Sequence, residues 1–283
     1  MSPMTATSNS SPEIARALPL GSCNINVHDV GEGEPILLIH GSGPGVTAWA
    51  NWRGVIPVLS QKARVVAPDM LGFGYTSCPP DMQLNIDAWV RQLTDLLDAL
   101  GLPRVSVVGN SFGGAIALAL AHRHPERVKK LVLMGAVGVS FPISEGLNKV
   151  WGYQPSLEAM RELIGIFAFD QGIVTDDLVK MRYEASTRAD VQQRFSALFP
   201  EPRQRGVDML ALPESALREI KQRTLIIHGR DDRVIPLEVS EKLLRLLPHA
   251  DMHVFGECGH WVQIEKTAAF TRLLTEFLIE PQT

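Results

Sequence analysis

The chain has 283 residues, of which 45% are hydrophobic, and its formal net charge is −4. This length and composition allow one large core, and the negative charge disfavours a nucleic-acid partner. No stretch reaches about 18 apolar residues, so we expect no membrane span. The three cysteines form no C-x-x-C pair or His/Cys cluster, which favours a reducing cytoplasm; we expect neither a metal nor a cofactor.

Apolar, strand-like runs alternate with helical patterns along the chain. The first 14 residues are polar and predict a disordered tail, not a signal peptide. Strands are predicted at residues 25–29, 36–40, 64–68, 105–109, 131–137, 224–228 and 252–255. Helical patterns lie between them, as at residues 85–100 and 237–247. This alternation predicts an α/β fold with a mostly parallel sheet covered on both faces.

The strand rhythm breaks between residues 138 and 212, where the sequence is helical in character. A helical insertion between two strands of such a sheet predicts a lid that covers a cavity. A surface insertion without a role is the alternative. The predicted organisation is a core made of residues 1–137 and 213–283, with residues 138–212 as the lid.

Residues 109–113 read Gly-Asn-Ser-Phe-Gly and directly follow a predicted strand. A run of helix formers, Gly-Ala-Ile-Ala-Leu-Ala-Leu, begins at residue 114. Strand, G-x-S-x-G and helix is the context in which a serine is held on a sharp turn with its hydroxyl exposed. Ser111 is therefore the candidate nucleophile, and it needs a histidine base that a carboxylate orients.

The candidate base is His260, which follows the predicted strand at residues 252–255. Gly259 before it permits the tight turn that presents the imidazole ring. The chain has seven other histidines, which we assign to surface, strand or loop positions; His40, for example, would hold a loop by hydrogen bonding. Cys258 is interpreted as a loop residue and not as a second nucleophile.

The candidate acid lies in Gly-Arg-Asp-Asp, in the loop that leaves the predicted strand at residues 224–228. Ser, acid and His then occur in the order expected for a triad on such a sheet. Two aspartates compete for the role, Asp231 and Asp232, and the residues alone leave the choice open.

An attack on a carbonyl also needs hydrogen-bond donors for the oxyanion that develops. One donor is the backbone N–H of the residue after the nucleophile, here Phe112. The other is expected in the loop after an earlier strand, where residues 40–45 read His-Gly-Ser-Gly-Pro-Gly. Gly41 and Gly43 let backbone amides face inward, and Ser42 is the candidate donor.

Six motifs occur in one order along the chain: His-Gly-Ser-Gly-Pro-Gly at 40–45, Trp-Ala-Asn-Trp at 49–52, Gly-Asn-Ser-Phe-Gly-Gly at 109–114, Arg-Tyr-Glu at 182–184, Gly-Arg-Asp-Asp-Arg at 229–233 and Cys-Gly-His-Trp at 258–261. Together they resemble the meta-cleavage-product hydrolases of bacterial aromatic catabolism, which are carbon–carbon bond hydrolases of the α/β-hydrolase fold. The resemblance covers the chain from about residue 31 to residue 278. Esterases share the triad loops, whereas the first loop, Asn110, Arg182 and Trp261 are more specific to this family.

The resemblance implies both a site and a reaction. In this family the acid is the fourth residue of Gly-Arg-x-Asp, which selects Asp232. The substrate is a 2-hydroxy-6-oxohexa-2,4-dienoate, a catechol ring-fission product, and hydrolysis of its C5–C6 bond yields 2-hydroxypenta-2,4-dienoate and a carboxylic acid. Asn51, Asn110, Arg182 and Trp261 would hold the dienoate end. A homo-oligomer is also implied.

The group on C6 must fit under the lid, and overfilling a packed site costs roughly 1–3 kcal/mol. Val137, at the end of its predicted strand, is bulky, as are Ile143, Leu147, Val150 and Trp151 in the lid segment. These side chains predict a preference for hydrogen or a short alkyl group at C6 over phenyl.

Two other classes of function remain open. A carboxylesterase shares the triad, and a ligand-binding protein of this fold can retain a triad without turnover. A haloalkane dehalogenase is disfavoured, because its nucleophile is an aspartate and this chain has Ser111.

Overall fold

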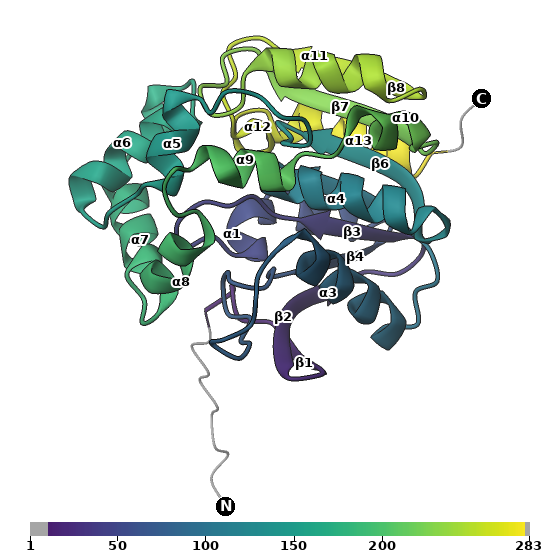
Figure 1. The fold of residues 1–283 in the computed structure, drawn as a ribbon, viewed down its shortest axis with the longest axis horizontal. Helices are drawn as coiled ribbons and strands as arrows, with labels where there is room; N and C mark the ends of the chain where they lie inside the picture. The colour runs from purple at the N-terminus through teal and green to yellow at the C-terminus, as the bar shows by residue number, and fades with distance from the viewer. Residues whose placement is uncertain (1–10, 281–283) are drawn as a thin grey trace, which may run out of the picture.

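A single eight-stranded sheet forms the centre of the molecule (Figure 1), with the order β1-β2-β4-β3-β5-β6-β7-β8. The computed structural model describes residues 11–280, so residues 1–10 of the predicted tail lie outside the described residues. The strands are β1 (Arg16–Leu20), β2 (Cys23–Val30), β3 (Pro35–Ile39), β4 (Arg64–Pro68), β5 (Val105–Asn110), β6 (Val128–Met134), β7 (Arg223–Gly229) and β8 (Ala250–Phe255).

Only the first part of the sheet is antiparallel. Strand β2 pairs antiparallel with both β1 and β4, whereas β4, β3, β5, β6, β7 and β8 all run parallel to one another. All six residues of β5 are buried, as expected for a parallel strand that is covered on both faces. The predicted α/β fold with a mostly parallel, doubly covered sheet is confirmed.

The helices of the structure are α1 (Ala48–Trp52), α2 (Ile56–Leu59), α3 (Ile86–Ala99), α4 (Phe112–Arg123), α5 (Glu145–Trp151), α6 (Leu157–Phe167), α7 (Asp176–Ser186), α8 (Val191–Leu198), α9 (Gln204–Leu210), α10 (Glu214–Glu219), α11 (Leu237–Leu246), α12 (Val262–Glu265) and α13 (Thr267–Leu278). Two single-turn 3₁₀ helices, Pro125–Arg127 and Gln171–Ile173, complete the set.

The two faces of the sheet have separate hydrophobic cores. Because side chains alternate along a strand, Leu37 and Ile39 of β3 join the core beneath α3, α4 and α11, whereas Ile36 and Leu38 join the core beneath α1, α2 and α13. The sheet is therefore held rigidly from both sides. Its parallel strands end at one edge, where ligands of open α/β sheets bind.

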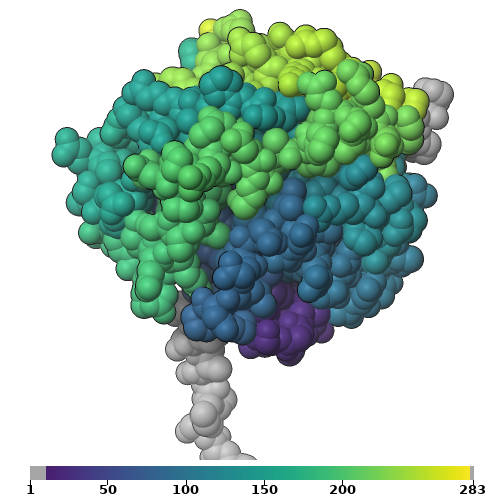
Figure 2. Space-filling model, viewed as in Figure 1, coloured from purple at the N-terminus to yellow at the C-terminus, as the bar shows by residue number. Residues whose placement is uncertain are grey.

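Helices α5 to α9 form a group at that edge of the sheet (Figure 1). In Figure 2 their teal-to-green atoms lie against the blue atoms of the first half of the chain. Side-chain caps start three of these helices: Ser144 for α5, Ser156 for α6 and Thr175 for α7 each accept a backbone N–H of the first turn. The division into a core and a lid of residues 138–212 stays a prediction.

Three details differ from the sequence-based expectations. Strand β6 ends at Met134 and not at residue 137, because Gly135 takes a φ of 49° that turns the chain. Strand β1 had not been predicted; it contains Pro19, which is tolerated because β1 is an edge strand. Glu13, part of the predicted tail, is hydrogen-bonded to the sheet, because Nδ2 of Asn26 donates to its carbonyl.

Candidate active site

Ser111 lies on the sharp turn between β5 and α4. Its φ is 53°, a conformation that a non-glycine residue holds only when its surroundings enforce it. Glycines on both sides permit the close approach: a Cβ atom on Gly109 would lie 2.4 Å from the carbonyl oxygen of Gly113, and one on Gly113 would lie 2.4 Å from that of Ile39. The motif thus holds the serine at the end of the central strand, as a nucleophile elbow requires.

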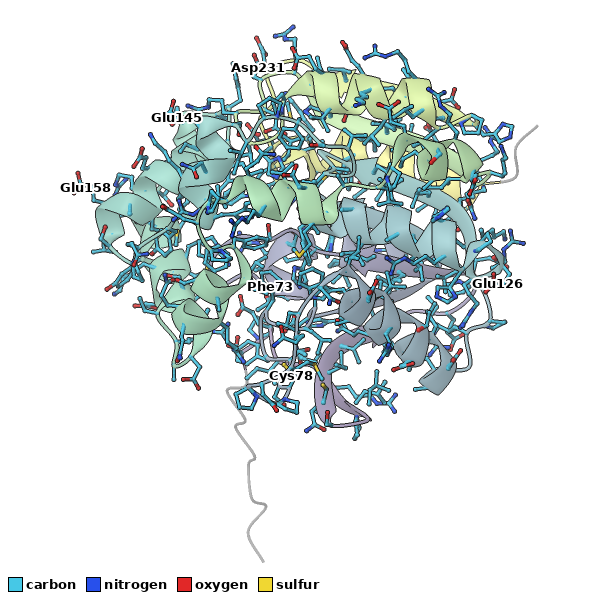
Figure 3. The ribbon with its side chains drawn as sticks, in the orientation of Figure 1. Phe73, Cys78, Glu126, Glu145, Glu158 and Asp231 are labelled. Atoms are coloured by element: carbon cyan, nitrogen blue, oxygen red, sulfur yellow. The ribbon has the colours of Figure 1, made fainter. Side chains whose placement is uncertain are left out.

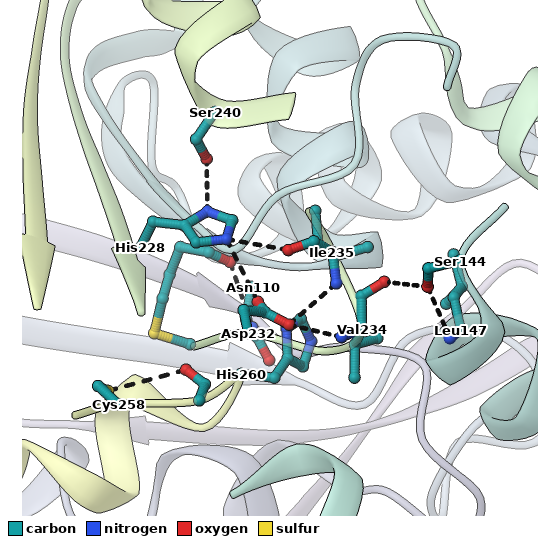
Figure 4. A network of polar contacts seen from close by, with 12 residues as sticks. Asn110, Ser144, Leu147, His228, Asp232, Val234, Ile235, Ser240, Cys258 and His260 are labelled. Atoms are coloured by element: carbon teal, nitrogen blue, oxygen red, sulfur yellow. Dashed lines mark hydrogen bonds and ion pairs between the residues drawn. The ribbon is translucent and has the colours of Figure 1, made fainter. Parts of the chain in front are cut away.

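His260 and Asp232 form a buried pair (Figure 4), with 2.7 Å between Nδ1 of the histidine and Oδ2 of the aspartate. The other carboxylate oxygen accepts the backbone N–H groups of Val234 and Ile235, at 2.7 and 2.9 Å. Burial alone would raise the pKa of the Asp232 carboxyl, but His260 and these hydrogen bonds bring that pKa below its ordinary value. The aspartate is therefore ionised and fixes the imidazole ring.

This pair is supported by His228 and Gly135, for which the sequence predicts no role in the site. His228 of β7 places Nε2 3.5 Å from Oδ2 of Asp232, and its Nδ1 is 2.7 Å from the Ser240 hydroxyl. Burial lowers the pKa of His228. Gly135 lies beneath the pair, where a Cβ atom would be 3.1 Å from Nδ1 of His260. An isolated glycine inside a predicted strand, here residues 131–137, is the sequence signal for such a close approach.

The two candidate acids have different environments. Asp231 does not contact His260; its carboxylate accepts the backbone N–H of Cys258 at 3.3 Å, and its side chain is 31% exposed. Figure 3 shows it at the periphery of the molecule. The Asp232 side chain is only 1% exposed and faces the histidine. Only Asp232 is placed to orient the ring.

The loop that carries the base is attached to the C-terminal end of α6. The backbone N–H groups of His260 and Trp261 both donate to the carbonyl of Phe167, at 2.7 and 3.2 Å. The rings of Phe167 and Trp261 stack, with centroids 4.9 Å apart and planes 10° from parallel. A Cβ atom on Gly259 would come within 2.6 Å of the same carbonyl. The helical segment over the sheet therefore helps to position His260, the candidate base.

His40 orients the loop that carries the second candidate oxyanion donor. The backbone N–H of Met70 donates to Nε2 of His40 at 2.9 Å, so the ring proton is on Nδ1 and donates to the carbonyl of Gly41 at 2.7 Å. Burial lowers the pKa of His40 to about 4, which keeps the ring neutral. The N–H of the same Gly41 donates to Oδ1 of Asn51 at 3.3 Å. The N–H and the carbonyl of Gly41 are therefore both held in place.

The backbone N–H groups of Ser42 and Phe112 donate to no protein acceptor within residues 11–280. Both flank the candidate nucleophile, since Phe112 follows Ser111 and Ser42 shares a cavity with it. The hydroxyl of Ser42 accepts a hydrogen bond from the indole N–H of Trp151 in α5, at 2.9 Å. Two unpaired amides beside a serine are what an oxyanion needs.

One cavity brings most of the predicted site residues together. Ser111 and His260 line it, although no hydrogen bond joins them in the described part of the chain. Such bonds are often long in an empty site and shorten when substrate binds. The predicted substrate-binding and oxyanion residues that also line the cavity are Gly41, Ser42, Gly43, Asn51, Asn110, Arg182 and Trp261.

Arg182 and Asn51 are polar residues of the cavity lining. Arg182 is half-buried in α7 and donates to the carbonyl of Pro44 at 3.1 Å. Burial lowers the pKa of its guanidinium, and the carboxylate of Glu13 opposes that shift. The Nδ2 group of Asn51 is buried without a partner in the described residues. An unpaired buried donor costs free energy unless a ligand accepts from it.

Some residues predicted to surround the C6 group do not line the cavity. Val137 is fully buried and beyond the end of β6, where its backbone N–H donates to the carbonyl of Ser111 at 3.1 Å. Ile143 and Trp151 are also absent from the lining, whereas Leu147 and Val150 of α5 are part of it. The cavity wall there includes Val234 as well, which follows the candidate acid.

No group of three or more His, Cys, Asp or Glu side chains in residues 11–280 is arranged to hold a metal ion. In the same residues, no helix is both long and apolar enough to cross a membrane.

The chain is similar to known proteins over almost its full length. Residues 34–267 match the model of the α/β-hydrolase fold family. A 2-hydroxy-6-oxo-2,4-heptadienoate hydrolase from Pseudomonas putida is 55% identical over 270 residues, which are 95% of this chain and 98% of the relative. A 2-hydroxymuconate semialdehyde hydrolase from a Pseudomonas species is 56% identical over 277 residues, 98% of each chain.

A solved structure gives the same result. The meta-cleavage product hydrolase from Pseudomonas fluorescens, as a serine-to-alanine variant complexed with acetates, superposes with a TM-score of 0.93 at 52% identity, over 94% of this chain and 97% of that one. These similarities confirm the resemblance seen in the motifs. The chain belongs to the α/β-hydrolase fold family and, within it, to the meta-cleavage product hydrolases.

Proposed function

We propose that this protein hydrolyses the C5–C6 bond of 2-hydroxy-6-oxohexa-2,4-dienoates, with Ser111, His260 and Asp232 as its catalytic triad. The observation that carries the proposal is one cavity lined by two kinds of group. A serine on an elbow and a histidine oriented by a buried carboxylate are the first, and the guanidinium of Arg182 is the second. A substrate with both a reactive carbonyl and a carboxylate fits this lining.

The chemistry explains why both the triad and the guanidinium are needed. Breaking C5–C6 directly would expel a carbanion, which is a very poor leaving group. A proton added first at C5 converts the dienol into a keto form, whose C2 carbonyl can accept the electrons of the broken bond. Arg182, with Asn51 and Asn110, would hold the carboxylate and the 2-oxygen during this step, because a carboxylate removed from water needs a charged partner.

The second step is attack on the C6 carbonyl. Either water or the Ser111 hydroxyl adds there, and His260 removes the proton through Nε2, because Nδ1 is bonded to Asp232. The oxyanion would accept hydrogen bonds from the N–H groups of Ser42 and Phe112. Collapse of the tetrahedral species breaks C5–C6. One water is consumed, and the products are 2-hydroxypenta-2,4-dienoate and the carboxylic acid that contains C6.

We propose that the C6 group is small. Leu147 and Val150 from α5 and Val234 from the acid loop line the cavity. Ser144, the cap of α5, ties these segments together, because its hydroxyl donates to the carbonyl of Val234 at 2.6 Å. Branched side chains on two joined segments leave less room than alanine or glycine would. The two relatives named above act on substrates whose C6 bears a methyl group or a hydrogen atom, by their names.

The test is kcat/KM for ring-fission products with hydrogen, methyl, isopropyl and phenyl at C6, followed by loss of their visible absorbance. We expect cleavage of all four, with phenyl about tenfold or more slower, since overfilling costs roughly 1–3 kcal/mol. p-Nitrophenyl acetate is the control for a carboxylesterase. Higher kcat/KM for this ester than for every ring-fission product would overturn the proposal, and a preference for phenyl would overturn only its size argument. Binding without multiple turnover would indicate a non-catalytic relative.

We also propose the cytoplasm as the location and a homo-oligomer as the assembly, in line with the family resemblance. Strand β8 is the last strand of the sheet and exposes Val254, so it offers an unpaired edge to a second copy of the chain. Light scattering after size-exclusion chromatography tests the assembly, and a monomeric mass would contradict it.

A further inference from the structure

Glu13 lines the same cavity as Arg182, although it precedes the first strand. The charged lining residues, apart from His260, are Arg53, Arg182 and Glu13. Two guanidinium groups and one carboxylate leave one net positive charge, which equals the charge that a single substrate carboxylate can neutralise. Among residues 11–280, Glu13 is the only acidic residue of the lining, at a cavity that we expect to bind an anion.

The position of Glu13 is built into the fold. Its carbonyl accepts a hydrogen bond from Nδ2 of Asn26 at 2.9 Å, and the backbone N–H of Ala15 donates to Oδ1 of the same asparagine at 2.7 Å. Asn26 is buried in β2 and donates also to Asp69 at 2.8 Å. The main chain on both sides of Glu13 is therefore attached to the sheet.

The carboxylate of Glu13, in contrast, has no fixed partner. It makes no hydrogen bond and no ion pair within 4.0 Å among the described residues. It nevertheless acts on Arg182: burial lowers the pKa of the guanidinium, and Glu13 is the largest of the influences that oppose this shift. A charge that is close enough to act on Arg182 but is not paired with it also acts on any carboxylate bound there.

We propose that Glu13 is a specificity-determining residue that weakens the hold of this cavity on carboxylates and thereby speeds release of the dienoate product. The inference rests on the proposed function, in which substrate and product share one carboxylate end. Repulsion from Glu13 raises the free energy of both bound anions alike. Such uniform binding changes KM and product affinity but not the barrier of the chemical step.

The experiment compares wild type with Glu13→Gln, which removes the charge and retains the shape. The probe is sorbate, hexa-2,4-dienoate, a stable carboxylate that resembles the product, and calorimetry measures its dissociation constant. We expect sorbate to bind about three- to fivefold more tightly to the variant at low salt, the scale of a half-exposed charge interaction. In about 0.5 M salt the difference should shrink, because exposed charges are then screened.

Three controls separate charge from structure. The neutral ligand hexa-2,4-dienamide should bind wild type and Glu13→Gln equally. Glu13→Asp retains the charge and should bind sorbate like wild type. Glu32→Gln removes an exposed carboxylate outside the cavity lining and should change nothing. Because no hydrogen bond involves the Glu13 carboxylate, all variants should keep the melting temperature of wild type.

Equal or weaker sorbate binding by Glu13→Gln would overturn the inference, and so would an equal gain for the amide, or absence of sorbate binding to both proteins. The measurement does not depend on catalysis. If wild type fails to cleave ring-fission products but the sorbate pattern holds, the proposed function fails with the product-release role, and the weakening of carboxylate binding by Glu13 stands. If cleavage is found without the sorbate pattern, only the role of Glu13 fails.

Discussion

The triad and the polar lining of the cavity, Arg182, Asn51 and Glu13, are constructed differently. In the triad, Ser111, Asp232 and His260 each follow a strand of the parallel sheet directly or within a few residues, and each side chain is almost completely buried. In the polar lining, Arg182 comes from α7 and Glu13 from the segment before β1. Proton transfer tolerates little displacement and needs the rigid sheet, whereas attraction of a carboxylate acts over distance and can use mobile side chains.

Hydrogen bonding differs between the triad and the polar lining in the same way. Both carboxylate oxygens of Asp232 have partners within the protein. In contrast, within the described residues Nδ2 of Asn51 has no partner and Arg182 is bonded only to the carbonyl of Pro44. Satisfied groups hold the geometry of the triad, and unsatisfied donors remain available for a ligand. Mutations in the two sets should therefore have different effects.

The largest effect is expected for Ser111→Ala. Turnover of ring-fission products should fall by about 10⁴ to 10⁶, as for loss of a triad nucleophile, while the melting temperature changes little. Stopped-flow absorbance also shows whether the substrate is still ketonised, which would separate that step from C–C cleavage. Turnover near that of wild type would show that Ser111 is not part of the mechanism.

The pair Asp232→Asn and Asp231→Asn tests the geometry of the acid. An amide at 232 would stabilise the wrong tautomer of His260, so kcat should fall by about 10⁴. The matched change at Asp231, which bonds a backbone N–H outside the pair, should leave kcat within a few-fold. A larger loss in Asp231→Asn would reverse the assignment.

Arg182→Gln tests the polar lining that is proposed to bind the substrate carboxylate. We expect kcat/KM for ring-fission products to fall by the roughly 2–5 kcal/mol that a broken buried charge pair costs, and kcat/KM for neutral p-nitrophenyl acetate to stay nearly constant. Arg161→Gln, on the outer side of α6 and paired with Asp176, is the matched control and should affect neither substrate. Equal losses on both substrates in Arg182→Gln would indicate a folding role instead.

The smallest effect concerns the hydrogen bond that joins α5 to the loop after β3. Trp151→Phe removes the indole donor to Ser42 but can retain the stack on Phe199, whose ring lies 4.1 Å away. The loss of about 0.5–1.5 kcal/mol should appear in the free energy of unfolding from urea titration. kcat should fall by less than about tenfold, on the same scale. An unchanged unfolding free energy would mean that the bond contributes nothing.

The same difference between the triad and the polar lining explains what could be predicted from the sequence. Strands with uninterrupted apolar runs are visible, and the run at residues 64–68 coincides with β4. Ser111 and His260 stand in short motifs directly after such runs, so local sequence is sufficient to nominate them. The choice of Asp232 over Asp231 needed the family resemblance, because both aspartates occupy one loop.

The rest depends on contacts between distant segments. His228 looks like a core residue of its strand, and only the folded loop places Asp232 against it. Val137 was expected at a strand end facing substrate, but Gly135 ends β6 early. Glu13 lies in a polar stretch that predicted a tail, and its position depends on Asn26. No local pattern encodes these contacts.

The central claim is that the polar lining of the cavity binds the dienoate carboxylate and that the triad cleaves. Two measurements on the same two variants test it together: the sorbate dissociation constant and turnover of p-nitrophenyl acetate. Ser111→Ala should bind sorbate like wild type and lose ester turnover, whereas Arg182→Gln should lose sorbate affinity and keep ester turnover. Parallel losses of both properties in both variants would contradict this division of roles between the polar lining and the triad.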